Sequence, residues 1–174
     1  MPELEIEKVY LLKQLPEDLA NFKFQEARVG YFFDPNARDA LRIRKKGDKY
    51  ELIKKETNSA YERVEHTINI KKGEFDVLIK SAVRSYEKHR YNYPFKGHVC
   101  EIDVYLGKLI GYARVEVEFK NIKELKNFVP PVWFGDEITK INHKIHEDIG
   151  LVTFEDMKER YKEKGITLKK IDIK

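Results

Sequence analysis

The sequence contains a single cysteine, Cys100, so the chain cannot form an intramolecular disulfide. Four cysteine or histidine ligands at the spacing of a zinc site are also absent. No apolar run is long enough to span a bilayer, and the first residues lack the basic-then-apolar order of a secretion signal. These absences favour a reducing compartment, and we expect a cytoplasmic protein that does not associate with membranes.

Glycine is also scarce, and no closely spaced glycines form a loop that could hold phosphate through backbone amides. No repeat, low-complexity segment or Pro/Gly/Ser-rich linker divides the chain. A length of 174 residues suits one domain with a sizeable core, so we expect a single domain over residues 1–174. The net charge of +4 suits a phosphate-bearing ligand without requiring one.

Apolar and charged residues alternate through much of the sequence, and a period of two is typical of strands with one apolar face. The strands predicted in this way are residues 3–7, 24–33, 41–44, 50–56, 61–70, 83–93, 100–104 and 115–118. Lys46-Gly47-Asp48 predicts a tight hairpin turn. A sheet of about eight strands tends to close, since closure removes its exposed edges. We therefore expect an α+β fold built on an eight-stranded antiparallel closed β-barrel.

Helical signals are fewer. The predicted helices are residues 16–20, 74–81, 121–128 and 153–165. The last is the clearest, because Thr153 and Asp156 resemble a capping box and Gly165 would end the helix. We expect the helices to pack outside the barrel.

The charged faces of the predicted strands are sorted by sign. The charged face of a half-buried sheet usually meets water, but a solvated face usually mixes the two signs. Like charges two residues apart on one face repel each other unless something neutralises them. The acidic sets are Glu3, Glu5 and Glu7, Glu101 and Asp103, and Glu116 and Glu118; the basic set is Arg42 and Arg44, which Lys55 can join across a hairpin.

A metal-chelated triphosphate would neutralise both sets at once. Hard cations such as Mg²⁺ prefer carboxylate oxygens, and arginine offers a planar fork that matches phosphate oxygens. A barrel of about eight strands can hold side chains and one small ligand. In such a barrel the charged faces would line the interior, and the apolar faces would point outward and need cover from helices.

Several segments resemble, in the same order, the motifs of a known family. They are residues 5–12 (an ExExK-like opening), 41–44 (RxR), 50–55 (a lysine-bearing strand), 63–65 (an acidic strand), 88–91 (KxRY), 101–105 (EIDxF), 115–119 (AEVEF) and 133–139 (WxGxEVT). The series resembles the CYTH family, also called triphosphate tunnel metalloenzymes. The likeness runs from about Glu5 to Thr139.

The resemblance implies an eight-stranded antiparallel tunnel with metal-dependent triphosphatase activity, inorganic triphosphate as the default substrate, and Mg or Mn as the cofactor. It implies that metal is bound by Glu5, Glu7, Glu116 and Glu118, and that phosphate is bound by Arg42, Arg44, Lys55 and Arg90. Glu65 and Asp103 would complete the acidic lining as catalytic residues that orient a second metal or the attacking water.

Other activities of the family stay open at this point. They are thiamine triphosphate hydrolysis, class IV-like adenylyl cyclisation of ATP, and processing of RNA 5′-triphosphate ends, which is the only role expected for nucleic acid. Binding of polyphosphate or nucleotide without catalysis is a further alternative. The metal count and the oligomeric state, including a homodimer, also stay open.

The sequence departs from the family pattern at two places. Val9 stands where the family has a lysine, and the adjacent Lys8 should point to the opposite strand face. The basic residue that relatives often place near the C-terminal helix has no clear counterpart. A tunnel short of two cations is expected to turn over poorly. Lys54 and Lys55 face opposite sides of one strand, and we favour Lys55 because its spacing from Tyr50 resembles the family's.

Three other features favour structural roles. His143 and His146 do not form an HExxH motif, so we expect a solvated helix face there. Cys100 lies on an apolar strand face and is expected to be a packed thiol. The basic residues between 158 and 170 are expected to be a solvated helix exterior rather than a nucleic-acid patch.

Overall fold

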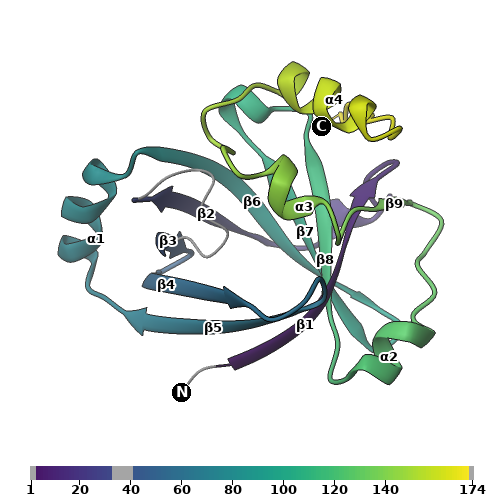
Figure 1. Cartoon of the computed structure of the whole chain (residues 1–174), viewed down its shortest axis with the longest axis horizontal. Helices are drawn as coiled ribbons and strands as arrows, with labels where there is room; N and C mark the ends of the chain where they lie inside the picture. Colours follow the sequence, from purple (N-terminus) through teal and green to yellow (C-terminus); the bar gives the residue numbers. More distant parts are fainter. Residues whose placement is uncertain (1–2, 33–40, 173–174) are drawn as a thin grey trace.

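The structure is a computed structural model that describes residues 3–32 and 41–172. The described residues form nine strands: β1 (Glu3–Leu12), β2 (Phe24–Tyr31), β3 (Leu41–Lys46), β4 (Lys49–Thr57), β5 (Glu62–Asn69), β6 (Arg84–Phe95), β7 (His98–Tyr105), β8 (Ala113–Glu118) and β9 (Phe134–Glu137). Neighbouring strands are antiparallel in the order β5-β4-β3-β2-β6-β7-β8-β1-β9. The further pairing of β5 with β1 closes β1 to β8 into a barrel (Figure 1).

Strand β1 closes the barrel because it changes neighbours along its length. Its first half pairs with β5, from Glu3↔Glu65 to Ile6↔Glu62, and its second half pairs with β9. The other edge of β1 pairs with β8. The predicted eight-stranded closed barrel is therefore confirmed, and β9 is an addition beside β1. Strand β2 ends at Tyr31, and Phe33 of the predicted strand lies outside the described residues.

The helices are α1 (Lys72–Leu78), α2 (Ile122–Asn127), α3 (Asn142–Ile145) and α4 (Phe154–Glu163). Thr153 caps α4 as predicted, since its backbone N–H donates to Asp156 Oδ2 at 2.8 Å and its hydroxyl accepts from the Asp156 N–H at 3.3 Å. The helix predicted over residues 16–20 is instead a single 3-10 turn at Leu19–Asn21. Helix α3 was not predicted. No helix among the described residues combines the length and the apolar character needed to cross a membrane.

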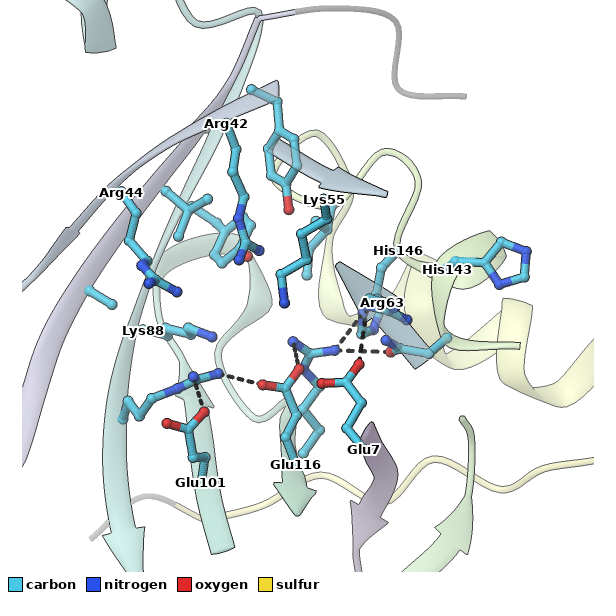
Figure 2. Close-up of a pocket in the computed structure, with 18 of the residues that line it drawn as sticks. Glu7, Arg42, Arg44, Lys55, Arg63, Lys88, Glu101, Glu116, His143 and His146 are labelled. Carbon is cyan, nitrogen blue, oxygen red and sulfur yellow. Dashed lines mark hydrogen bonds and ion pairs between the residues drawn. The ribbon is translucent and has the colours of Figure 1, made fainter. Parts of the chain in front are cut away.

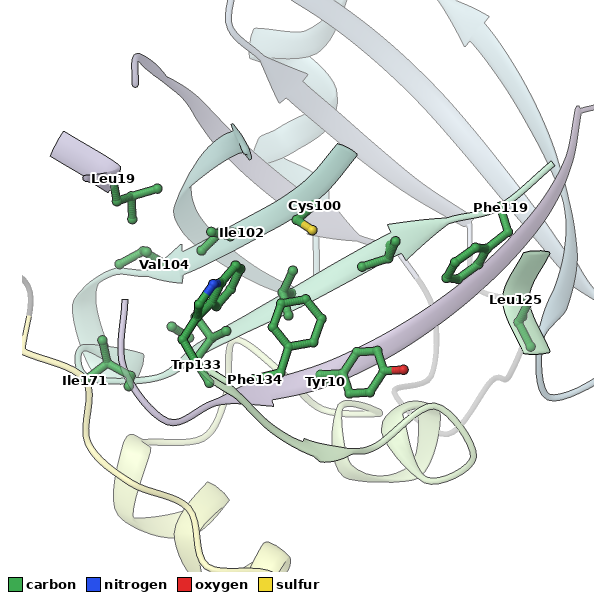
Figure 3. Packing of buried hydrophobic residues seen from close by; sticks show 14 of the residues in the cluster. Tyr10, Leu19, Cys100, Ile102, Val104, Phe119, Leu125, Trp133, Phe134 and Ile171 are labelled. Atoms are coloured by element: carbon green, nitrogen blue, oxygen red, sulfur yellow. The ribbon is translucent and has the colours of Figure 1, made fainter. Parts of the chain in front are cut away.

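The outward faces of β1, β7 and β8 are apolar and are covered by packed side chains. Cys100, Ile102 and Val115 are buried on this face, and Trp133 and Phe134 pack over it, as do residues of α2 (Figure 3). The expected cover for the apolar strand faces is therefore present. Burial raises the pKa of the Cys100 thiol to about 12, which agrees with a packed and unreactive side chain.

A second apolar cluster fills one end of the barrel interior. It joins Val9, Tyr86 and Tyr105, which lie on inward-facing strand positions, to Ile145 of α3 and Met157 of α4. Helices α3 and α4 lie at this end of the barrel (Figure 1). The sequence predicted that charged strand faces line the interior, and it did not predict this apolar end. The apolar end also accounts for Val9, which is 0% exposed and packs in this apolar cluster, where burial of an unpaired lysine would be costly.

Candidate active site

The remainder of the interior is a charged cavity of about 250 Å³. Nine of the ten side chains predicted for the site line this cavity, namely Glu5, Glu7, Arg42, Arg44, Lys55, Glu65, Arg90, Glu116 and Glu118. The tenth, Asp103, is buried behind the lining at 0% exposure. The period-two pattern places these side chains inward because successive residues of a strand point to opposite faces. Figure 2 shows Glu7, Glu101 and Glu116 on one side of the cavity and Arg42, Arg44 and Lys55 on the other, with Arg63 beside Glu7.

Carboxylates face each other across neighbouring strands on the acidic side. Glu7 of β1 lies opposite Glu118 of β8, and Glu116 of β8 lies opposite Glu101 of β7. Burial, together with the negative charges of Glu101, Glu5, Glu116 and Glu7, raises the pKa of Glu118 to about 7. Like charges in this register are destabilising when nothing neutralises them, so the acidic side favours a bound cation.

The acidic side fits a divalent metal in the chemistry of its donors. Among the described residues, no three His, Cys, Asp or Glu side chains converge on one point, because most of these acids pair with bases. However, Glu118 has no ion pair within the described part of the chain. Oε1 of Glu7 is buried and accepts no hydrogen bond, although Arg63 Nη1 lies 3.1 Å away. Glu7 and Glu118 therefore offer carboxylate oxygens that accept no hydrogen bond within the described part of the chain, and carboxylate oxygens are the ligands that Mg²⁺ and Mn²⁺ prefer.

The basic side is built around Glu65 of β5. Nη2 of Arg42 lies 3.3 Å from Glu65 Oε2, and Nζ of Lys55 lies 3.1 Å from the same oxygen. Burial alone would raise the pKa of Glu65, but these two cations and Arg44 outweigh burial and lower it to about 2. Lys55 points into the cavity, whereas Lys54 is exposed on the outer face. The cavity thus contains the lysine that the sequence favoured.

Asp103 lies beneath the cavity in contact with three cationic side chains. Arg90 donates two hydrogen bonds to its carboxylate, from Nε at 2.6 Å and Nη2 at 2.7 Å. Lys88 forms a further hydrogen bond, and Arg114 Nη2 lies 3.6 Å away. Arg90 also extends to Glu116 at 2.7 Å. Asp103 therefore fixes the bases that line the cavity and does not line it itself.

Lys88 is poised to change its charge when an anion binds. Burial and the neighbouring Arg90 lower the pKa of Lys88 to about 7, against the attraction of Asp103. A polyanion in the cavity would raise this pKa, so binding at pH 7.5 should take up a fraction of a proton. Calorimetry of tripolyphosphate binding without metal, in buffers of different ionisation enthalpy, measures that uptake. Lys88→Arg should remove the Lys88 part of it, and equal uptake by this variant would contradict the assignment.

No protein-family model matches the sequence, but two curated relatives do. An inorganic triphosphatase of Nitrosomonas europaea is 33% identical over 138 residues, covering 78% of this chain and 89% of the relative. The chain belongs to the CYTH family of triphosphate tunnel proteins. An inorganic triphosphatase of Acetivibrio thermocellus is also 33% identical, over 115 residues that cover 64% of this chain and 71% of the relative.

Solved structures support the tunnel fold. A crystal structure of an inorganic triphosphatase superposes with a TM-score of 0.63 at 30% identity and covers 84% of this chain and 94% of the solved chain. A protein of Pyrococcus horikoshii shares the fold at a TM-score of 0.50 and 21% identity, covering 70% of this chain and 83% of the other. At such low identity, the second likeness concerns the fold alone.

The tunnel contains cations that the sequence did not assign. Arg63, Arg84, Lys88 and Arg114 all line the cavity, so this CYTH protein is not short of bases despite Val9. A signal for three of them was available. Arg63 precedes Glu65 by two residues, Lys88 precedes Arg90 by two, and Arg114 precedes Glu116 by two. Each therefore shares an inward face with a residue that was assigned.

The structure also corrects the predicted environment of His146. It was expected on a solvated helix face, but it is partly buried and lines the tunnel. Its Nε2 lies 2.6 Å from the Tyr112 hydroxyl, and its Nδ1 lies 3.3 Å from Arg114 Nη1. Burial and the nearby Arg114 hold the pKa of His146 well below its usual range, so the ring is neutral. The sequence lacked this signal because α3 is only four residues long.

Proposed function

We propose that this protein hydrolyses inorganic triphosphate inside the barrel, with a divalent metal ion, Mg²⁺ or Mn²⁺, held by Glu5, Glu7, Glu116 and Glu118. The observation that carries the proposal is a cavity inside the barrel whose lining consists largely of arginine, lysine and glutamate side chains. Its volume of about 250 Å³ suits a small polyanion rather than a macromolecule. Two curated relatives named inorganic triphosphatase add support.

Phosphoryl transfer depends mainly on positioning and on neutralising charge. Arg42, Arg44, Lys55 and Arg90 would align the triphosphate, and Arg63, Lys88 and Arg114 would add to the positive lining. Arginine suits this role because its charge persists and its fork matches phosphate oxygens. When bound, the metal ion supplies charge neutralisation and lowers the pKa of a coordinated water.

Glu65 and Asp103 are better suited to holding cationic side chains in position than to accepting a proton in this reaction. Burial alone would raise the pKa of the Glu65 and Asp103 carboxyls, but the cations around them outweigh burial and lower each pKa to about 2. A group with so low a pKa is a weak base at neutral pH. We therefore assign Glu65 and Asp103 to holding the phosphate-binding cations in position.

Tyr31 lines the cavity, and we propose that its hydroxyl helps to orient the attacking water. Burial alone would raise the pKa of its hydroxyl, but Arg42 and Arg84 outweigh burial and lower it. The guanidinium of Arg84 lies 3.8 Å above the Tyr31 ring. The two cations also favour a hydroxyl that donates a hydrogen bond to the water or to a phosphate oxygen.

The adjacent lysines of β4 offer a matched test. Phosphate release from tripolyphosphate should fall about a hundredfold or more in Lys55→Ala, because a charged contact to phosphate is lost. Lys54→Ala should match the wild type, because Lys54 is exposed on the outer face. Equal rates in the two variants would contradict the proposed tunnel chemistry.

The same assay identifies the substrate. Tripolyphosphate, thiamine triphosphate, ATP and RNA with a 5′-triphosphate are compared under Mg²⁺ and Mn²⁺, and cyclic AMP is measured alongside free phosphate. We expect the highest kcat/KM for tripolyphosphate. Cyclic AMP as the main product from ATP, or tight binding without turnover, would replace this proposal with a cyclase or a binding protein.

A further inference from the structure

Helix α3 and its C-cap residue reach the charged cavity through Asn142 and His146. Asn142 and His146 lie four residues apart and both line the cavity. Both contact the same atom of one residue: Nη1 of Arg114 donates to Asn142 Oδ1 at 3.0 Å and lies 3.3 Å from His146 Nδ1. The helix therefore holds one edge of the Arg114 guanidinium.

The other edge of this guanidinium faces the acids. Nη2 of Arg114 lies 2.7 Å from Glu116 Oε1 and 3.6 Å from Asp103 Oδ2. An arginine side chain is long and has many rotamers, so contacts on two edges fix its plane far better than contacts on one. Without α3, Arg114 would be free to fold onto Glu116 and Asp103 alone.

The ring of His146 also contacts a buried tyrosine pair on the side away from Arg114. An arginine donates hydrogen bonds and cannot accept them, so Nδ1 of His146 must accept and the ring proton must lie on Nε2. Nε2 then donates to the Tyr112 hydroxyl at 2.6 Å, and Tyr112 lies 2.9 Å from the hydroxyl of Tyr161 in α4. Both tyrosines are fully buried. The chain of contacts runs from the apolar end of the barrel to the charged cavity.

We propose that His146 and Asn142 are positioning residues that hold Arg114 ready to bind a phosphate of the substrate. This inference rests on the proposed function, and it makes α3 part of the active site. Attachment of α3 to the barrel does not require the polar contacts, because Ile145 and Ile149 already pack into the apolar cluster at that end. The polar contacts instead set the direction of one guanidinium.

The first test compares three variants by steady-state kinetics on tripolyphosphate. His146→Phe keeps the ring volume but removes the acceptor, and kcat/KM should fall about 10- to 100-fold. His146→Gln supplies an amide acceptor and should recover most of the loss. His89→Phe, the same change on the outer face of β6, should match the wild type. A merely structural role would lower the thermal midpoint of His146→Phe while leaving kcat/KM of the folded protein unchanged, and that result would overturn the proposal.

A double-mutant cycle tests whether His146 acts through Arg114. Arg114→Lys keeps the charge but loses the planar fork. In that background, His146→Phe should cost less than about twofold, because the coupling partner is gone. The same 10- to 100-fold loss in both backgrounds would overturn the positioning role.

A spectroscopic readout separates this inference from the proposed function. In a long-range ¹H–¹⁵N spectrum, His146 should show the tautomer with the proton on Nε2, and Arg114→Lys should shift its Nδ1 resonance. An unchanged resonance would show that Arg114 does not contact the ring, whatever the substrate. If the spectrum behaves as expected and tripolyphosphate is neither bound nor hydrolysed, the proposed function fails while the arrangement of α3 stands.

Discussion

Replacing Glu116 with glutamine should lower triphosphate turnover about a thousandfold while the barrel stays folded. Glu116 lies opposite Glu101 on β7, and its carboxylate forms ion pairs of 2.7 Å with Arg90 and with Arg114. Although burial alone would raise it, these cations hold the pKa of Glu116 well below its usual range, so the group is a permanent anion. Glutamine keeps the shape and removes that charge.

The expected size follows from two losses. A metal ion at the reacting phosphate is worth several kcal/mol, and each 1.4 kcal/mol or so is a tenfold change in rate. Removal of the Glu116 charge also weakens the hold on Arg90 and Arg114, which both pair with this carboxylate. The fold should survive, because Arg90 keeps its contacts with Asp103 and Arg114 keeps those with Asn142.

Steady-state kinetics under Mg²⁺ and Mn²⁺, with calorimetric titration of Mn²⁺, measures both effects. Mn²⁺ affinity should fall together with kcat, and a chelator should abolish wild-type turnover. Glu56→Gln is the matched control, since Glu56 is an exposed carboxylate 3.6 Å from His66 on the outside of the barrel. Turnover of Glu116→Gln within threefold of the wild type would remove Glu116 from the metal site.

The strands were predictable because alternation reports directly which face of a strand is apolar. The cavity follows from the same pattern once the sheet closes, so Glu7, Arg44 and Glu116 could be placed inward from sequence alone. The apolar end of the barrel was missed, although Val9-Tyr10-Leu11-Leu12 breaks the alternation. A continuous apolar run indicates a strand buried on both faces, and β1 is buried on both faces at this end.

Alternation could not predict how deeply a side chain is buried or which distant residues it contacts. Alternation places Asp103 on the inner face, but only the convergence of Lys88, Arg90 and Arg114 buries it beneath the cavity. Helix α3 is shorter than two helical turns and so has no periodic signal. Its contact with Arg114 joins residues 28 and 32 positions apart. Such a contact exists only after the barrel has formed.

Replacing Asp103 with alanine should destabilise the protein by about 3–5 kcal/mol, because removing one partner of a buried ion pair leaves uncompensated charge. Asp103 is 0% exposed and neutralises Lys88 and Arg90 while lying close to Arg114. For a domain of this length, we expect the thermal midpoint to fall by about 10 °C. Tripolyphosphate affinity should fall as well, since the bases that line the cavity lose their common anchor.

The dependence of the free energy of unfolding on acid pH gives a second, independent test of the Asp103 carboxylate. Burial alone would raise the pKa of Asp103, but Arg90 and Lys88 outweigh burial and lower it from 3.8 to about 2. A lowered carboxyl pKa stabilises the folded state above about pH 4, and this stabilisation is lost as the pH falls through 2. Asp103→Asn should therefore unfold with a flatter dependence on pH over this range in urea titrations. If Asp103→Asn and the wild type lose stability in parallel between pH 4 and 2, the buried carboxylate does not carry the charge that holds Lys88 and Arg90 in place.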